Sequence, residues 1–352
     1  MAGQLPATGG QTESLGFAGM ISGVYYNKLI TGGGANFPDS LPWEGGQKKY
    51  IHEGFVFEMD DNGNLQLTQS FSLPDTVAYA ASVTTPLGIV YAGGENQHGI
   101  LNSVYLMQWN TENNQVVFKD LPPLQVALTN ASLASIENII YLIGGETPDS
   151  TSGNLYTLDV SDPGKGWIAL ANAPVQVSHA VWVPVINKED KKLYLMGGRK
   201  KNPTGISDFY SSLFVYDVVH NAWTEKASLP YAISAGTGAS IHENEIYLFG
   251  GDKGEVFNQV EKALAAIRNE TDQTKKTKLV KQKNNLLAIH PGFSKEILVY
   301  NIENNSWKNG TPIPFNVPVT TTLSQWGGEI FIISGEVRAG VRTPGILAGE
   351  IR

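Results

Sequence analysis

An apolar segment that ends in two adjacent glycines occurs five times along the sequence, and a sixth copy has serine in place of one glycine. In the middle of the chain these glycine pairs begin 51 to 53 residues apart. That spacing is close to the kelch period of about 50 residues. One Gly-Gly pair alone indicates little more than a turn, but six copies in phase predict a repeat architecture. The copies are LITGGG (29–34), IVYAGG (89–94), IYLIGG (140–145), LYLMGG (193–198), IYLFGG (246–251) and IFIISG (330–335).

Prolines and apolar residues keep the same phase in the last five repeats. Each proline lies 19 to 23 residues before a glycine pair, with an apolar residue seven positions earlier. Short alternating stretches such as LYTLD (155–159) and LFVYD (213–217) are typical of strands. Repeats of four short strands cannot bury both faces alone, so they stack around an axis. The sequence predicts an all-β fold, a six-bladed kelch-type β-propeller that forms one domain over residues 1–352.

The two ends of the chain are predicted to complete one blade together. Gln4-Leu5-Pro6 matches the end of a fourth strand, whereas the last repeat stops after its third strand, GILAGEIR (345–352). We therefore expect the N-terminal residues to help close the ring.

Two insertions follow glycine pairs, one at about 35–54 in blade one and one at about 252–296 in blade five. Long connections in a compact fold are usually functional. Residues 256–270 carry apolar side chains near helical spacing, and 277–289 can form a second helix, so we expect a helical flap. The basic run KKTKLVKQK (275–283) is interpreted as a solvated helix face. Both insertions flank blade six on one face of the ring.

The residue after each glycine pair is predicted to face the mouth of the propeller. A competing interpretation is that these side chains only hydrogen-bond loop backbones. The residues are Asn36 (one position beyond Ala35), Glu95, Glu146, Arg199, Asp252 and Glu336.

Composition excludes several classes of function. The net charge of −8 argues against binding to nucleic acid or to an anionic membrane surface, and no apolar run reaches membrane-spanning length. The chain has no cysteine, so it can form neither a thiolate metal site nor the Tyr-Cys cofactor of galactose oxidase, which has a kelch propeller. The histidines show no ligand spacing. We predict no metal and no cofactor.

The motifs GGGANFPDSLPWEGGQKKYIHEG (32–54) and SGEVRAGVRT (334–343) resemble the N-acetylneuraminate epimerases, the bacterial sialic acid mutarotases. Because the blade that resembles residues 1–73 comes late in those proteins but first here, the sequence resembles the cyclically permuted mutarotase branch. The resemblance implies a sugar-acid substrate, a general acid/base at Glu336 and an arginine partner at Arg342. It also suggests a homodimer. The first residues, MAGQLPATGG, do not form a signal peptide. We therefore expect a periplasmic location if a signal peptide was removed from this chain, and a cytoplasmic location otherwise. The insertion after Asp252 matches only loosely.

Mutarotation opens a hemiketal ring and closes it again on the other face, which is general acid/base work. Glu336 could take the anomeric proton, and the planar fork of Arg342 could hold the sugar's carboxylate. Further substrate contacts are expected from Arg199, the carboxylates after the glycine pairs and four residues of the blade-one insertion. Those four are Asn36, Lys49, His52 and Glu53, and the alternative is that they pin the loop.

Two other functions stay open. Kelch propellers often act as non-catalytic binding modules for proteins or carbohydrates, since fold alone does not fix function. A sialidase or another glycosidase is the third possibility, although VVHNAWTEK (218–226) and IENNSWKNG (302–310) lack the Asp-box pattern of sialidases.

Overall fold

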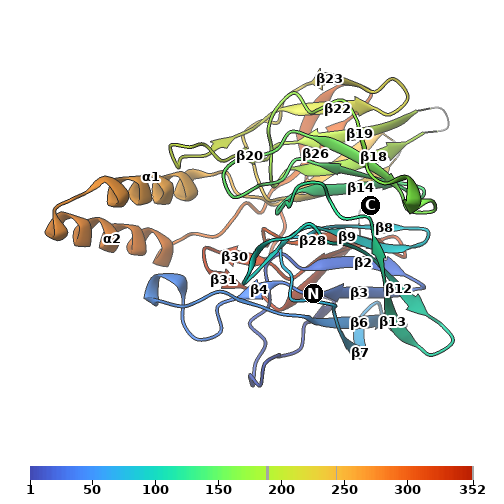
Figure 1. The fold of residues 1–352 in the computed structure, drawn as a ribbon, viewed down its shortest axis with the longest axis horizontal. Coiled ribbons are helices and arrows are strands. Elements are labelled where there is room, and N and C mark those ends of the chain that lie inside the picture. The colour runs from blue at the N-terminus through green and yellow to red at the C-terminus, as the bar shows by residue number, and fades with distance from the viewer. Residues whose placement is uncertain (188–189, 243, 351–352) are drawn as a thin grey trace.

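Six four-stranded antiparallel sheets form the blades of a β-propeller, which confirms the predicted fold (Figure 1). The structure is a computed structural model that describes residues 1–187, 190–242 and 244–350. Blade one consists of β2 (Ile21–Tyr25), β3 (Lys28–Gly32), β6 (Glu53–Met59) and β7 (Leu65–Ser72), and blade two of β8 (Ala81–Thr85), β9 (Gly88–Ala92), β12 (Val104–Asn110) and β13 (Gln115–Leu121). Blade three consists of β14 (Ser132–Ile136), β15 (Ile139–Ile143), β16 (Leu155–Asp159) and β17 (Ile168–Ala169), and blade four of β18 (Val181–Ile186), β19 (Lys191–Met196), β22 (Leu213–Asp217) and β23 (Ala222–Lys226). Blade five consists of β24 (Thr237–His242), β25 (Glu245–Phe249), β26 (Ile297–Asn301) and β27 (Ser306–Asn309), and blade six of β28 (Thr322–Trp326), β29 (Glu329–Ile333), β32 (Gly345–Glu350) and β1 (Gly3–Gln4).

The N-terminal strand β1 supplies the fourth strand of blade six, as expected. Gly3 pairs with Ile346 and Gln4 with Gly345. The Leu5 N–H then donates to the Pro344 carbonyl at 2.8 Å. Blade six is therefore built from both ends of the described chain.

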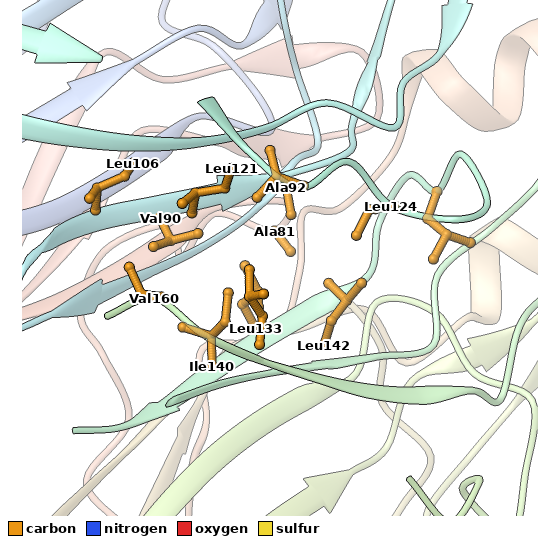
Figure 2. Close-up of a cluster of buried hydrophobic side chains, with 13 residues drawn as sticks. Ala81, Val90, Ala92, Leu106, Leu121, Leu124, Leu133, Ile140, Leu142 and Val160 are labelled. Carbon is orange, nitrogen blue, oxygen red and sulfur yellow. The ribbon is translucent and has the colours of Figure 1, made fainter. Parts of the chain in front are cut away.

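Buried apolar side chains gather in six clusters, one at each interface between neighbouring blades. Figure 2 shows the cluster between blades two and three, to which both sheets contribute aliphatic side chains. Two of the apolar residues that lie seven positions before a proline also join blades, because the Trp223 indole N–H donates to the Ala171 carbonyl and that of Trp307 to the Ala227 carbonyl, both at 2.8 Å. The blades are held by these lateral contacts because a single sheet leaves its faces open.

The glycine pairs are required by close approach between blades. Gly144 has a φ of +68°, and a Cβ there would lie 2.1 Å from the Val177 carbonyl oxygen of the next blade. Blade six solves the same problem with Ser334, which has a φ of 54°. Its hydroxyl accepts from the Phe17 N–H at 2.9 Å and donates to the Thr343 carbonyl at 2.7 Å. The serine thus replaces conformational freedom with hydrogen bonds to blade one.

Six residues, one just before the first strand of each blade, form a closed ring of backbone hydrogen bonds around the axis. Each N–H donates to the carbonyl of the equivalent residue in the preceding blade, with N···O distances from 2.7 to 3.3 Å. All six have positive φ, five of them without being glycine. The axial ring consists of Gly19, Tyr79, Asn130, His179, Ala235 and Thr320.

Four of the loops between second and third strands form two-stranded hairpins on one side of the propeller. They are β4 (Ala35–Asn36) with β5 (Lys49–Tyr50), β10 (Glu95–Asn96) with β11 (Gly99–Ile100), β20 (Arg199–Lys200) with β21 (Asp208–Phe209), and β30 (Glu336–Arg338) with β31 (Val341–Arg342). A 3₁₀ turn, Pro42–Glu44, lies within the blade-one insertion, and another, Pro163–Lys165, lies in blade three.

The blade-five insertion forms the two predicted helices, α1 (Glu255–Asn269) and α2 (Gln273–Ala288). Figure 1 shows them projecting as an arm from the side of the propeller that carries β4, β20, β30 and β31. Helix α2 begins four residues before the predicted start because Asp272 caps it, accepting from the Lys275 N–H at 3.0 Å. Neither helix of the described chain is long and apolar enough to span a bilayer.

Candidate active site

A cavity of about 370 Å³ opens on the hairpin side of the axial ring. Five ring residues line it, and all six line a second cavity of about 190 Å³ between the first strands of the blades. The ring therefore lies between the two spaces. The larger cavity is within the range of small-molecule sites.

Backbone pairing brings the residue after each glycine pair to the axis. In every blade this residue pairs with the one that precedes the axial-ring residue, as Arg199 does with Ser178 and Glu336 with Val319. Four of these side chains line the cavity, namely Glu95, Arg199, Asp252 and Glu336. In blade one the paired residue is Ala35, one position before the Asn36 of the sequence prediction.

Glu336 and Arg342 lie directly opposite each other in the β30–β31 hairpin. Arg342 Nη1 is 2.9 Å from Glu336 Oε2, and the Gly340 N–H donates to Oε1 at 3.0 Å. The Arg342 side chain is 5% exposed and stacks over the Phe37 ring, 4.9 Å from its centroid. Nε of this guanidinium makes no hydrogen bond with any described residue, whereas Nη1 is engaged in the ion pair with Glu336. Buried donors of this kind are strong binding groups for a carboxylate.

Glu146 is enclosed by blade four and does not line the cavity. It accepts from the Ser178 hydroxyl at 2.8 Å, and Arg199 Nη2 lies 3.5 Å away. Burial opposes ionisation of Glu146, but His179, Arg199 and the Ser178 hydrogen bond outweigh it, so its pKa lies below the usual value. Glu146 therefore anchors its neighbours from behind the cavity wall.

His179 is a neutral member of the same cluster. Arg199 Nη2 lies 3.4 Å from its Nε2, and Ser178 Oγ lies 3.0 Å from its Nδ1. Because a guanidinium can only donate, Nε2 accepts and Nδ1 carries the proton. Burial, and then the charge of Arg199, lower the pKa of His179 to about 3.

Lys48, and not the predicted Lys49, reaches the cavity. Its Nζ lies 2.9 Å from Glu95 Oε1, which also accepts from the Tyr50 hydroxyl at 2.7 Å. Burial and this hydrogen bond raise the pKa of Tyr50 to about 12. Since side chains alternate along a strand, Lys48 and Tyr50 face one side and Lys49 the other.

Four residues of the blade-one insertion named by the sequence lie outside the cavity. Asn36 is buried and donates to the Gly16 carbonyl at 3.2 Å, and Lys49 pairs with Asp39 at 3.0 Å in solvent. His52 and Glu53 contact each other, since the His52 N–H donates to Glu53 Oε2 at 3.2 Å. These contacts fit the pinned-loop alternative.

His290, which follows α2, completes the wall beside Glu336 and lines the cavity. It is 8% exposed, and its Nδ1 accepts from the Gly292 N–H at 3.0 Å, so a neutral ring carries its proton on Nε2. Burial lowers its pKa. In the sequence, nothing but residue type marks His290 as a candidate for the site. Among the residues the structure describes, no three His, Cys, Asp or Glu side chains form a metal-binding group.

The sequence and the fold were compared with known proteins. The family model described as N-acetylneuraminate epimerase matches residues 120–352. An N-acetylneuraminate epimerase of Haemophilus influenzae (strain PittEE) is 28% identical over 223 residues, and one of Pasteurella multocida (strain Pm70) is 27% identical over 231 residues. These alignments cover 63% and 65% of this chain but 57% and 58% of the relatives. The chain thus spans somewhat more than half the length of the curated relatives it matches.

A solved structure, that of YjhT, is similar to the whole fold. It superposes with a TM-score of 0.66 and covers 99% of this chain and 97% of its own, at 15% sequence identity. At that identity the likeness concerns the fold alone.

Proposed function

The chain belongs to the N-acetylneuraminate epimerase family, and on this premise we propose that it is a sialic acid mutarotase, which accelerates the interconversion of the α and β anomers of N-acetylneuraminate. One observation carries the proposal. Glu336 and Arg342 line one cavity of monosaccharide size, and Nε of the buried Arg342 has no hydrogen-bond partner among the described residues. The homodimer and the periplasmic location remain predictions.

The reaction needs two proton movements. One proton leaves the anomeric hydroxyl and another reaches the ring oxygen as the C–O bond breaks, which gives the open-chain ketone. Rotation about the bond to the carbonyl carbon and the reverse steps close the ring on the other face. Glu336 is the group that takes the first proton, and the neutral His290 can supply the second from Nε2. Arg342 holds the sugar's carboxylate next to both.

The charged groups of the cavity favour this proposal over a scaffold for proteins. Lys48, Arg199 and Arg342 gather there among carboxylates, beside apolar side chains such as Phe257 and Leu287. A carbohydrate-binding module without catalysis would share the cavity, so only a rate measurement distinguishes it.

The test is anomer exchange of N-acetylneuraminate followed by NMR. We expect the protein to accelerate the exchange, Glu336→Gln to abolish the acceleration while the sugar still binds, and Glu112→Gln, an exposed turn residue, to behave as wild type. Binding without acceleration would identify a carbohydrate-binding module. Release of free sugar from a sialoside would indicate a glycosidase, and an unimpaired Glu336→Gln would remove Glu336 from the mechanism.

A further inference from the structure

One part of the cavity wall, formed by blades four and five and by helix α1, holds buried polar atoms without partners. Ser234 Oγ and Arg199 Nε are buried and make no hydrogen bond with any described residue. Ser234 is 2% exposed, and both residues line the cavity. Buried polar groups in folded proteins are nearly always paired, so unpaired ones that face a cavity point to a ligand.

An acceptor lies beside these donors. Ser234 and Asp252 form a backbone bridge, with N···O distances of 2.9 and 2.8 Å, so their side chains are neighbours. Asp252 accepts from the Gly254 N–H through Oδ1 at 2.8 Å and feels the charge of Arg199. The wall therefore offers two donors and a carboxyl acceptor within one small area.

Apolar side chains border this polar group. Val256, Phe257 and Val260 of helix α1 line the cavity, and the Phe257 ring stacks on Arg199 with its centroid 4.3 Å from the guanidinium carbon. A patch that combines donors, an acceptor and aliphatic carbon does not match a carboxylate, which would meet Asp252, or a lone hydroxyl, which has no apolar part.

Helix α1 is hydrogen-bonded to the propeller, which holds Val256, Phe257 and Val260 beside the polar atoms. The Glu261 carboxylate accepts both from the Ser207 N–H at 2.7 Å and from the Ser207 hydroxyl at 2.8 Å. Ser207 is 5% exposed, in the blade-four loop before β21. The predicted flap is therefore held as a wall of the cavity.

We infer that Arg199, Ser234, Asp252 and the Val256–Val260 face of α1 form a subsite for an N-acyl group on the sugar. The amide carbonyl accepts from Arg199 and Ser234, the amide N–H donates to Asp252, and the acyl carbon chain packs on the valines. The inference rests on the proposed function, since the sugar acid bound at Glu336 must extend to this wall.

The test compares N-acetylneuraminate with the analogue that carries a hydroxyl in place of the acetamido group. Exchange rates and dissociation constants are measured for both sugars with wild type, Ser234→Ala and Val260→Thr. Leu264→Thr is the matched control, because Leu264 lies on the same helix, is 44% exposed and does not line the cavity. Ser234→Ala removes a hydroxyl without a described partner, and melting curves verify that the variants fold.

We expect wild type to bind the acetamido sugar about tenfold or more tightly than the analogue. Each variant should lower this ratio roughly fivefold through the acetamido sugar alone, and the control should keep it. Equal losses for both sugars with exchange still accelerated would overturn the subsite and leave the function standing. If the variants alter the binding ratio but wild type does not accelerate exchange, the subsite stands and the proposed mutarotase function falls. If neither sugar binds, both proposals fall.

Discussion

Glu336 of blade six and Glu146 of blade three occupy the same position after their strands, but only Glu336 lines the cavity. The cause lies in the next blade. Blade four presents Ser178 and His179 to Glu146, whereas the equivalent positions of blade one are Ala18 and Gly19, which carry no polar side chain. Glu336 is instead contacted within its own hairpin, by Arg342 at Oε2 and by the Gly340 N–H at Oε1, and it lines the cavity. A repeat therefore positions equivalent carboxylates, and the adjoining blade decides which of them can react.

The arginines of the two clusters differ less than the glutamates. Arg199 and Arg342 each stack on a phenylalanine supplied by an insertion, Phe257 from blade five and Phe37 from blade one. Arg342 is the more buried, with 5% of its side chain exposed against 17% for Arg199. The insertions thus stack a phenylalanine on each arginine, so the main difference between the two groups of residues lies in Glu336 and Glu146.

Paired glutamine substitutions should separate the two clusters most clearly. Glu336→Gln removes the proposed general base and should lower the rate of catalysed anomer exchange by roughly 10² to 10⁴. Glu146→Gln should stay within about tenfold of wild type, because Glu146 acts only through Arg199 and His179. NMR exchange rates measure both. Similar losses in the two variants would contradict the comparison.

Glu146, Ser178, His179 and Arg199 form the cluster that blade four encloses, and this cluster should make the free energy of unfolding depend on pH. An unfolded histidine has a pKa of about 6.5, whereas that of His179 is lowered to about 3. As the pH falls from 6.5, the unfolded chain gains a proton that the folded chain does not, so stability falls by at most about 1.4 kcal/mol per pH unit. The lowered pKa of Glu146 adds loss in the same direction below about pH 4.5.

Urea unfolding at pH 6.5 and 5 measures the effect of His179. Wild type should lose up to about 2 kcal/mol more between these values than His179→Asn. Asparagine already occupies the equivalent position at Asn130 with positive φ, so the variant should fold. Identical pH dependence of the two proteins would exclude His179 as the cause.

Giving Glu336 the serine neighbour that Glu146 has should test whether the adjoining blade controls the carboxylate. Ala18→Ser places a hydroxyl at the position equivalent to Ser178. A hydrogen bond to Glu336 would stabilise its charged form and slow exchange roughly tenfold, as expected for a bond to a charged group. The pH profile of the exchange rate should shift to lower pH. Full activity with an unchanged profile would show that the neighbouring blade does not control the carboxylate.

Replacing the stacked phenylalanines should have the smallest effect. Phe37→Leu and Phe257→Leu each remove a cation–π contact, and binding of N-acetylneuraminate should weaken roughly two- to tenfold. We expect the larger loss for Phe37→Leu, because Arg342 is the more buried cation. Calorimetric titration gives both dissociation constants. A larger loss for Phe257→Leu would reverse the ranking of the arginines.

Most of the fold could be predicted because the repeat reflects steric requirements. The glycine pairs mark places where neighbouring blades nearly touch, and the last repeat lacks a strand that Gly3–Gln4 supplies. The family model matches residues 120–352, which contain blades three to five and three strands of blade six, and the permuted order of blade one remains a prediction. Glu336 and Arg342 were placed together correctly because they share one short hairpin.

The rest of the site depends on geometry that residue types do not reveal. The axial ring contains six different amino acids, so positive φ there leaves no pattern to recognise. In blade one the sequence prediction named Asn36, whereas the residue paired at the axis is Ala35, one position earlier. The prediction also named Lys49, whereas the neighbouring Lys48 lines the cavity because side chains alternate in this extended segment. Ser234 gave no signal, since its significance lies in a hydroxyl without a partner.

The axial ring also affects the electric field inside the cavity. Each of its six N–H groups donates in the same rotational sense around the axis, so the peptide dipoles, about 3.5 D each, follow one another head to tail in a circle. The components of such a circle that lie in its plane cancel. The axial ring therefore adds no net in-plane dipole at the cavity floor, and directional groups such as Arg342 and the Gly340 N–H belong to the walls.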